Sequence, residues 1–263
     1  MTTSLIISTY NRPDALDVVL ESVCRQTRMP DEIIIADDGS REETVQLIKR
    51  WQQSGRLGVP LRHVWHPDEG FRLAMIRNKA IAAASGDYII QIDGDAFIHP
   101  RFVDDHIRMA RPNSFIKGTR IMLDKELSQE ICETKRFSYP SIFSPHIIQY
   151  RVKAFRNPIL RNFFEEFHPT DLSALGCNMA FWKKDAIGVN GYDEEFVGWG
   201  HEDTDFTMRL NRNGVKKRNI RYAALIYHLW HPQAGDGSVN AMLRDRQAQR
   251  GNARAQKGID QYL

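Results

Sequence analysis

Short runs of apolar residues alternate with helical patterns through the first hundred residues. Residues 5–8 predict a buried strand. The segment Asn11-Arg12-Pro13-Asp14 then opens a helix whose apolar positions recur three or four residues apart, at Leu16, Val19, Leu20 and Val23. Residues 33–36 predict a second strand, which ends in Asp37-Asp38-Gly39-Ser40, a sequence that suits a turn and a helix cap. The chain therefore opens with two β-loop-α units.

A third and a fourth strand are predicted at residues 63–65 and 88–92, with a helix over residues 72–84 between them. The fourth strand leads directly into Asp93-Gly94-Asp95. Strands and helices in this order resemble the nucleotide-binding half of a doubly wound α/β protein, in which ligands bind at the carboxyl ends of the strands. Polar side chains are expected at those ends, and the sequence places them there.

The second half of the chain is patterned less evenly. Residues 111–170 give no clean period and mix prolines with aromatic and basic residues, so no elements are predicted there. A recognisable pattern begins again at residues 175–181, a segment flanked by apolar residues. Residues 198–203 open a helix that Gly214 should stop, and residues 224–227 predict a strand. The polar, Arg-rich residues after Asn240 predict an exposed helix.

Length and composition narrow the class of protein. At 263 residues the chain can bury a full core without disulfides or a structural metal. Its net charge is only +3, with both signs intermixed, so composition predicts no nucleic-acid partner. Cys24, Cys132 and Cys177 show no paired spacing and are expected to be thiols in a reducing compartment. Without a secretion signal or an apolar run of about 18 residues, the sequence predicts a cytoplasmic protein.

Asp93-Gly94-Asp95 is the first motif that indicates chemistry. Two carboxylates at a strand end, separated by a Gly that lets the backbone turn, can bind one hard cation together with a diphosphate. By the dipeptide alone, an Asp-Gly turn between two strands is the commoner explanation. The polar motifs at the neighbouring strand ends favour the cation.

Four segments stand in one order along the chain: residues 6–12 (IISTYNR), 37–40 (DDGS), 70–78 (GFRLAMIRN) and 85–95 (SGDYIIQIDGD). In this order they resemble glycosyltransferase family 2 and its GT-A relatives, over about residues 4–100 and again over about residues 175–232. The resemblance implies a GT-A fold, a doubly wound mixed α/β sheet flanked by helices. It implies a single catalytic domain over residues 1–240, with a nucleotide-sugar-binding half to about residue 100, an acceptor half from about residue 101, and a basic tail at 241–263.

The resemblance also implies contacts with a UDP-sugar donor. Thr9 and Asp38 would contact the uracil or the ribose, and Arg72 and Arg77 would face the uracil or the phosphates. Simpler explanations stay open for two of these residues. Asp38 could cap a helix, and Arg77 could be a surface cation on its own helix.

A metal site follows from the same resemblance. Asp95 would bind the metal directly, Asp93 would contact the ribose or a metal-bound water, and Gly94 belongs to the donor site between them. The metal is expected to be Mn²⁺ (or Mg²⁺). GT-A relatives usually supply a late histidine as a further ligand, and Mn²⁺ accepts imidazole beside carboxylate. His228 is preferred over His231, and the other histidine is expected to be an ordinary core or surface residue.

Residues 176–180 resemble the segment that lines the donor sugar in this family, where small residues let a ring approach closely. Asn178 is therefore predicted to hydrogen-bond a sugar hydroxyl. A buried strand that contains Gly and places Met179 and Phe181 in the core explains the rest of the segment equally well.

The segment Gly198-Trp199-Gly200-His201-Glu202-Asp203 is similar to the acceptor motif of β1,4-galactosyltransferases, polypeptide N-acetylgalactosaminyltransferases and bacterial chondroitin-type polymerases. Acidic residues that stabilise a helix dipole, at about 0.3–1 kcal/mol each, would explain the carboxylates but not the Gly-Trp-Gly. The similarity implies that Asp203 is the general base, that Glu202 holds the acceptor and that Trp199 stacks on a sugar. The family often has Gly where this chain has His201.

The sequence thus predicts a metal-dependent, inverting glycosyltransferase that moves a sugar from a UDP-sugar to a hydroxyl of a glycan or lipid-linked glycan, in the synthesis of a bacterial lipopolysaccharide, O-antigen or capsule. The alternatives are a nucleotidyltransferase and a noncatalytic nucleotide-sugar-binding protein. With a lipid-linked acceptor, we expect the basic, aromatic middle of the chain and its Arg-rich tail to make a peripheral contact with the inner face of an anionic membrane.

Overall fold

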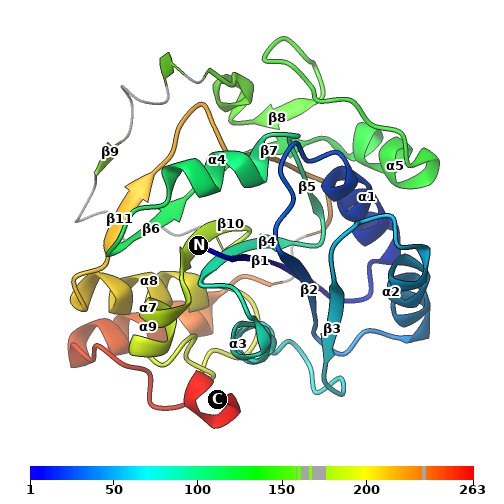
Figure 1. Cartoon of the computed structure of the whole chain (residues 1–263). Coiled ribbons are helices and arrows are strands. Elements are labelled where there is room, and N and C mark those ends of the chain that lie inside the picture. Colours follow the sequence, from blue (N-terminus) through cyan, green and yellow to red (C-terminus); the bar gives the residue numbers. More distant parts are fainter. Residues whose placement is uncertain (158, 161–165, 168–175, 233–234) are drawn as a thin grey trace.

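The computed structural model describes residues 1–157, 159–160, 166–167, 176–232 and 235–263. Within these ranges the chain forms two sheets with helices around them (Figure 1). The larger sheet has the spatial order β3 (Leu61–Trp65), β2 (Glu32–Asp37), β1 (Thr3–Thr9), β4 (Tyr88–Asp93), β10 (Asn178–Trp182), β6 (Ser114–Lys117), β11 (Lys216–Asn219) and β9 (Glu166–Phe167). The smaller sheet has the order β5 (Ala96–Ile98), β12 (Leu225–His228), β7 (Thr119–Leu123) and β8 (Ile147–Gln149).

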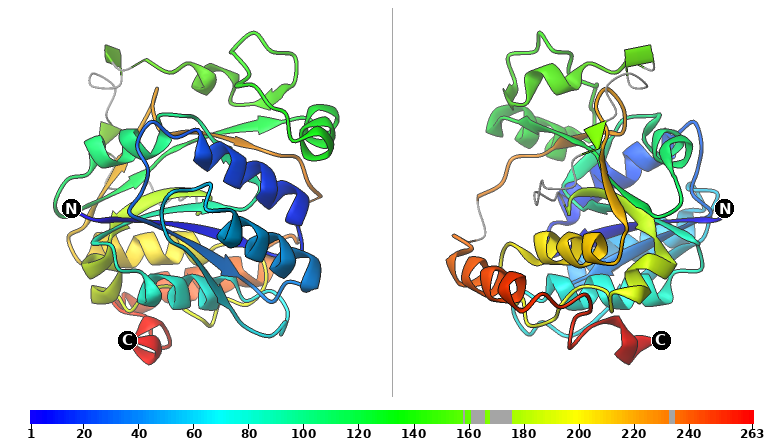
Figure 2. Two further views of the ribbon diagram at one scale, coloured as in Figure 1. Left: turned by 45° about the vertical axis from the view of Figure 1, so that its right-hand side comes forward. Right: turned by 90° about the vertical axis from the view of Figure 1, so that its left-hand side faces the viewer.

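The first four strands of the larger sheet are parallel, and β10 pairs antiparallel with β4. Side chains alternate along a strand, so Leu5 of β1 packs in one hydrophobic cluster and Ile6 in another. Helices α1 (Pro13–Cys24) and α2 (Glu42–Ser54) contribute to the first cluster, and α3 (Leu73–Ala83) contributes to the second (Figure 2). The prediction of a doubly wound mixed sheet flanked by helices is confirmed, as are its four N-terminal strands.

The later part of the chain adds α4 (Phe102–Met109), α5 (Lys125–Thr134), η1 (Arg151–Ala154), α7 (Lys183–Gly188) and α8 (Glu202–Arg212). Helix α8 lies between the predicted start motif and Gly214, as the sequence indicates. Residues 111–157, for which the sequence predicts no elements, contain β6, β7, α5, β8 and η1. These three strands have only four, five and three residues and are divided between two sheets. Strands this short do not produce a recognisable period.

The chain passes from the larger sheet to the smaller one between β4 and β5, at the Asp-Gly-Asp motif. Gly94 N donates to Ser8 O at 2.7 Å, and a Cβ on Gly94 would lie 2.9 Å from that oxygen. Glycine is therefore required at this crossing. Strand β5 pairs with β12 so that Ala96 lies opposite His228, and Leu229 N donates to Asp95 O at 2.8 Å. This pairing brings two motifs together that are far apart in the sequence.

The C-terminal residues contribute to the same core as the rest of the molecule. Helix α9 (Ser238–Arg250) packs on α8, and η2 (Ile259–Tyr262) packs on α3. Ile259 is fully buried, and Asp260 N donates to Asn190 Oδ1 at 2.8 Å. The boundary predicted after residue 240 falls inside α9. Among the described residues, no helix combines the length and the apolar character needed to cross a membrane.

Candidate active site

Asp95, His228 and His231 form a compact group where β12 ends. One ligand atom from each of the three side chains lies within 4.8 Å of the others. His228 Nε2 is 3.4 Å from Asp95 Oδ1, and His231 Nε2 is 3.2 Å from Asp95 Oδ2. The sequence leaves open which histidine joins Asp95, and the structure brings both to it.

The surroundings of this group fit a divalent cation. His228 Nδ1 lies 3.0 Å from Leu229 O, and His231 Nδ1 lies 2.7 Å from Pro232 O. A protonated Nδ1 can donate to each carbonyl, which leaves the Nε2 lone pair free on the side of Asp95. Burial lowers the pKa of His228 and favours the neutral imidazole that a metal requires. Asp95 Oδ1 is buried without a hydrogen-bond partner, as expected of an atom that binds a cation.

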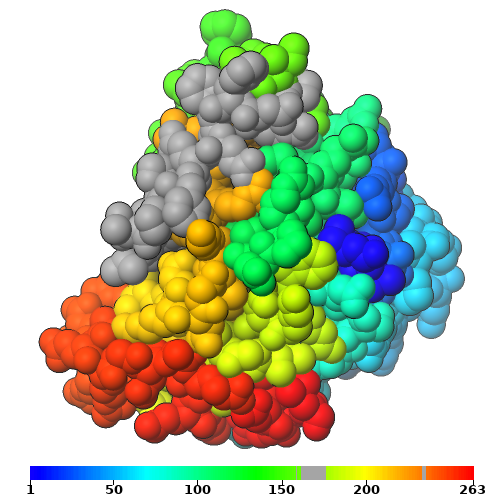
Figure 3. Space-filling view, turned by 60° about the vertical axis from the view of Figure 1, so that its left-hand side comes forward, coloured from blue at the N-terminus to red at the C-terminus, as the bar shows by residue number. Residues whose placement is uncertain are grey.

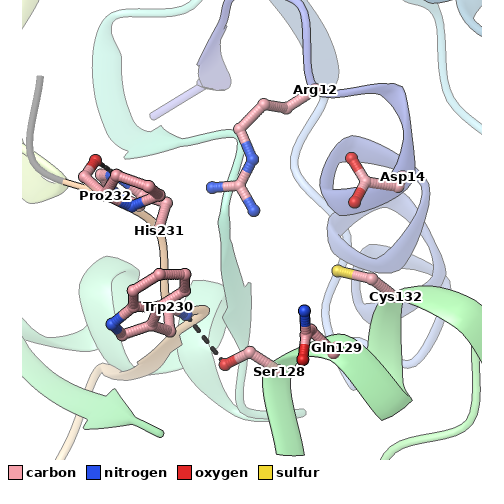
Figure 4. A pocket seen from close by; sticks show the side chains of 8 residues that line it. All are labelled: Arg12, Asp14, Ser128, Gln129, Cys132, Trp230, His231 and Pro232. Carbon is pink, nitrogen blue, oxygen red and sulfur yellow. Dashed lines mark hydrogen bonds between the residues drawn. The ribbon is translucent and has the colours of Figure 1, made fainter. Parts of the chain in front are cut away.

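A cation of the chain itself lies beside this group. Arg12, the residue before α1, places Nη1 at 3.1 Å from Asp95 Oδ2. Figure 4 shows its guanidinium extending from the start of α1 toward His231. A cavity of about 370 Å³ adjoins it, lined by Arg12, Asp14, Ser128, Gln129, Cys132, Trp230, His231 and Pro232. The sequence indicates no role for Arg12, because only the fold brings the β1–α1 loop to Asp95.

Arg77 of α3 connects the two carboxylate motifs. Its Nη2 lies 3.0 Å from Asp93 Oδ1, and its Nη1 lies 2.9 Å from Glu202 Oε1. The side chain is only 1% exposed, so the explanation of Arg77 as a surface cation is wrong. Because its guanidinium is directed to protein carboxylates, the structure does not support the predicted contact with uracil or phosphate. Instead, the end of β4 and the start of α8 share one buried positive charge.

Glu202 and Asp203 lie in the first turn of α8 and differ in environment. Asp203 is half-buried, and its two oxygens accept hydrogen bonds from Gly176 N at 2.9 Å and from Thr204 N at 2.6 Å. Glu202 is buried, and its Oε2 has no hydrogen-bond partner. Burial and the adjacent Asp203 raise the pKa of Glu202 to about 7, although Arg77 opposes this shift. Neighbouring carboxyls with different surroundings can take different roles in proton transfer.

The backbone before α8 explains the glycines of the acceptor motif. Gly198, Gly200 and His201 have φ angles of 85°, 94° and 71°, in the left-handed region. His201 therefore takes a conformation that favours glycine, which is the residue the related motif often has there. Trp199 lies within this loop with 40% of its surface exposed, and Asn240 Nδ2 of α9 donates to Trp199 O at 3.3 Å. The loop thus holds an indole ring at the surface beside the Glu-Asp pair.

Three residues predicted to bind the donor lie close together. Thr9 is the last residue of β1, Asp38 follows β2, and Arg72 precedes α3. Asp38 Oδ2 accepts from Arg72 N at 2.9 Å, and Asp38 Oδ1 lies 2.7 Å from His66 Nε2. Asp38 thus holds the residue before α3 in place, but it does not cap α2, whose start has no side-chain cap, so the simpler explanation of a helix cap is wrong. Thr9 Oγ1 is buried and has no hydrogen-bond partner. Contact of these residues with uracil or ribose stays a prediction.

Asn178, predicted to contact a donor sugar, makes several hydrogen bonds within the protein. The side chain is fully buried in β10, between β4 and β6. Its Nδ2 donates to Thr119 O and Ala224 O, both at 2.8 Å, and its Oδ1 lies 3.0 Å from His106 Nε2. These contacts engage both the Nδ2 and the Oδ1 of the amide within the protein, through partners distant in sequence. The contact with a sugar hydroxyl stays a prediction.

Arg120 of β7 is a site residue that the sequence did not reveal. Its Nη1 lies 3.8 Å from Cys177 Sγ, its Nε is buried without a hydrogen-bond partner, and its charge interacts with that of Asp93. It makes no ion pair within the part of the chain that the structure describes. All three cysteines are free, and burial raises the pKa of Cys177 to about 12. The sequence gives no signal for Arg120, because its strand lies in the weakly patterned region.

Comparison with known proteins agrees with this geometry. The family model described as glycosyl transferase family 2 matches residues 4–157, and the model described as N-terminal domain of galactosyltransferase matches residues 160–232. A chondroitin synthase of Escherichia coli is 29% identical over an alignment of 249 residues, and the alignment covers 86% of this chain and 34% of that protein. The chain therefore spans about a third of the length of this relative.

Solved structures resemble the fold. S. aureus TarS 1-349 in complex with UDP gives a TM-score of 0.64 at 16% identity, covering 100% of this chain and 68% of that chain. The mannosyltransferase PcManGT from Pyrobaculum calidifontis, in complex with GDP-Man and Mn²⁺, gives a TM-score of 0.59 at 14% identity, covering 93% of this chain and 60% of that chain. These likenesses confirm the prediction of a GT-A fold.

Proposed function

The chain belongs to glycosyl transferase family 2, and from this premise we propose that it transfers a sugar from a UDP-sugar to a hydroxyl of a glycan acceptor in one inverting displacement. The observation that carries the proposal is the link through Arg77. This buried residue joins Asp93, beside the candidate cation site, to Glu202, beside the candidate base. A donor cluster and an acceptor cluster thus adjoin each other, as a single displacement requires.

Asp203 acts as the general base in this proposal. It takes the proton of the attacking hydroxyl while the acceptor oxygen bonds to the anomeric carbon and the carbon–oxygen bond to the diphosphate breaks. The hydrogen bonds from Gly176 N and Thr204 N fix the direction of its carboxylate. Glu202 Oε2, which has no partner, would accept a second hydroxyl of the acceptor, and the exposed ring of Trp199 would stack on a sugar face.

On the donor side, Asp95 with His228 and His231 would hold Mn²⁺ or Mg²⁺, which would neutralise charge on the diphosphate. The Thr9 hydroxyl, buried without a partner, and Arg72 would contact the nucleoside. The relatives named chondroitin synthase and TarS in complex with UDP support a UDP-sugar donor and a polysaccharide product. We therefore assign the chain to synthesis of a bacterial surface glycan, such as a lipopolysaccharide, O-antigen or capsule.

The test is UDP release by the purified chain from a panel of UDP-sugars, with and without Mn²⁺. We expect slow metal-dependent hydrolysis of one donor. Asp95→Ala should weaken Mn²⁺ binding by more than the roughly 10–100-fold that loss of an outer-shell partner costs. Asp203→Asn should retain UDP binding and lower transfer by about 10²–10⁴-fold, the usual contribution of a general base.

A matched control separates catalysis from helix stabilisation. Glu43, like Asp203, is an acidic residue in the first turn of a helix, and it is exposed on α2. Glu43→Gln should leave UDP release unchanged. Equal losses of activity in the two variants would show that Asp203 only stabilises the helix dipole and is not the base. Release of pyrophosphate in place of UDP would indicate a nucleotidyltransferase, and UDP binding without turnover of any donor or acceptor would favour a binding protein.

A further inference from the structure

The chain contains a long segment without acidic residues. Residues 135–164 hold six Lys or Arg and no Asp or Glu, whereas the chain as a whole has 33 acidic residues, or about four in thirty. We call these residues the 135–164 segment. Its described part runs from α5 past β8 and η1. A charge bias of this kind favours an anionic partner.

The same segment exposes large apolar side chains. Among the described residues, fourteen large hydrophobic side chains are exposed, and six of these lie within seventeen consecutive positions. These six form what we call the 143–159 patch: Phe143, Ile148, Tyr150, Val152, Phe155 and Ile159. Phe143 is 84% exposed and Val152 74%. Such a concentration of exposed apolar residues usually marks an interaction surface.

Three of the five cations in the described part of the segment have no acidic partner, whereas Lys135 lies 4.0 Å from Asp17 and Arg156 pairs with Asp105. Arg151 donates to two backbone carbonyls, Ser144 O and Ile147 O, and Lys153 Nζ lies 4.1 Å from the centre of the Tyr150 ring. Neither residue, nor Arg136, makes an ion pair with a carboxylate in the ranges that the structure describes. Burial and the positive charges of Arg221 and Arg120 lower the pKa of Lys153, so this part of the surface already repels further cations.

The patch and the Arg-rich C-terminal residues lie at opposite ends of the molecule. In Figures 1 and 2 the green segment around β8 and η1 forms one end, and the orange-red α9 with the red C-terminus lies at the other. Figure 3 shows the same separation on the surface. One flat membrane cannot contact both ends at once. The sequence had suggested a contact through both regions, and this arrangement does not allow it. At the C-terminal end, Arg244 pairs with Asp245 and Arg254 pairs with Asp260, so part of its charge is already neutralised.

The patch also adjoins the candidate active site. Arg120 interacts electrostatically with Tyr150 of the patch and with Asp93 of the donor cluster, and it contacts Cys177, the neighbour of the Gly176 that holds Asp203. A surface that covers the patch would therefore lie on the side of the molecule from which Arg120 reaches the candidate active site.

We propose that the 143–159 patch seats the protein on an anionic lipid surface, with the apolar side chains inserted at the boundary of the acyl chains and Arg136, Arg151 and Lys153 at the phosphate headgroups. This contact is independent of the sugar transfer proposed above, because it needs neither donor nor metal. Its occupant is a bilayer rather than a protein because the segment combines uniform positive charge with scattered apolar residues of different shapes.

The experiment is flotation of the full chain with vesicles of phosphatidylglycerol and phosphatidylcholine, compared with vesicles of phosphatidylcholine alone. We expect binding to the anionic vesicles at low salt and weaker binding at high salt. Phe143→Ser with Val152→Ser, and separately Arg136→Glu with Lys153→Glu, should each reduce the bound fraction. Each cation removed should weaken partitioning by about fivefold.

Matched controls lie on α9. Val239 and Met242 are exposed apolar residues, and Arg246 and Arg250 are exposed cations, so Val239→Ser with Met242→Ser and Arg246→Glu with Arg250→Glu make the same chemical changes at the other end. These variants should float like the unmodified chain. Failure of the unmodified chain to float at low salt, or equal losses in patch and control variants, overturns the proposal. A dimer in light scattering that only the patch variants dissociate, without flotation, would assign the patch to a second copy and likewise overturn it.

Discussion

Arg77 is the single residue on which most of the candidate site depends. Arg77→Met would leave Glu202 buried and unpaired and would remove the partner of Asp93, so we expect a loss of about 3–5 kcal/mol in the free energy of unfolding. Arg77→Lys should lose less, because it keeps the charge but cannot reach two carboxylates with a fork of donors. Urea unfolding measures both. Arg50→Met, at an exposed position of α2, should change stability by less than about 0.5 kcal/mol, and equal midpoints for the two Met variants would contradict the role of Arg77.

Asp193 should make stability depend on pH. Burial raises its pKa from 3.8 to about 6, so ionising it in the folded protein costs free energy. This free-energy cost is absent below pH 3.8, where Asp193 is protonated in both the folded and the unfolded chain. Between pH 3.8 and about 6 the cost grows, because the unfolded chain ionises first. Above that window the cost is complete. Asp193→Asn should therefore raise Tm relative to the unmodified protein above the window and not below it, by about 2–4 °C per kcal/mol.

Thermal melts of both proteins on each side of this pH window measure the effect. Asp236 offers a control of opposite sign, because hydrogen bonds from Ser238 lower its pKa and its ionised form is stabilising. Asp236→Asn should bring no gain in Tm above the window. A gain for Asp193→Asn that is the same at both pH values would show that its cause is packing and not ionisation.

At this scale the sequence predicted which residues gather and not what each one contacts. The sequence could place Asp95 with the two late histidines, and Glu202 with Asp203, because each of these residues belongs to a motif at the end of a helix or strand. Arg77 and Asn178 were assigned to the donor because their motif suggested it, but their partners are set by burial and by strands distant in sequence. Residue spacing carries no information on such partners.

At the scale of elements, the loop before α8 stores strain at His201. A side chain with Cβ at φ 71° is disfavoured by about 1–2 kcal/mol relative to glycine. We expect His201→Gly to be more stable than His201→Ala by about 1 kcal/mol, since both lose the contact of Arg244 Nη1 with His201 Nδ1 and only one relieves the backbone. Thermal unfolding of the pair measures this difference. A more stable Ala variant would contradict the strain.

The elements that the sequence predicted are those with several buried residues in register. Strands β1, β2 and β4 are almost entirely buried, and α1 and α2 have clear apolar faces, so their patterns could be recognised. The elements between residues 111 and 157 could not be predicted, because β6 and β7 are completed by strands from other parts of the chain and β8 in turn pairs, among the described strands, only with β7. Their residues meet the requirements of a sheet only after the fold has formed.

At the scale of the whole molecule, the C-terminal residues should be needed for stability. Ending the chain after Lys257 would remove Ile259, whose full burial is worth about 1.5–3 kcal/mol, and the hydrogen bond from Tyr262 to Glu194. We expect a lower urea midpoint for this truncation. Deletion of Leu263 alone, which is 64% exposed, should have little effect. Equal midpoints for the two truncations would mean that residues 258–263 are dispensable, as a separate tail would be.

The shared guanidinium of Arg77 has a consequence for protein engineering. The two family models divide the chain near residue 158, with Arg77 in the first part and Glu202 in the second. A chimaera that joins the first part of this chain to the second part of a relative would inherit a buried positive charge and would need a carboxylate from the graft to neutralise it. Recombination of donor and acceptor specificities at that junction is therefore restricted to parents that supply such a carboxylate, whatever sugars they recognise.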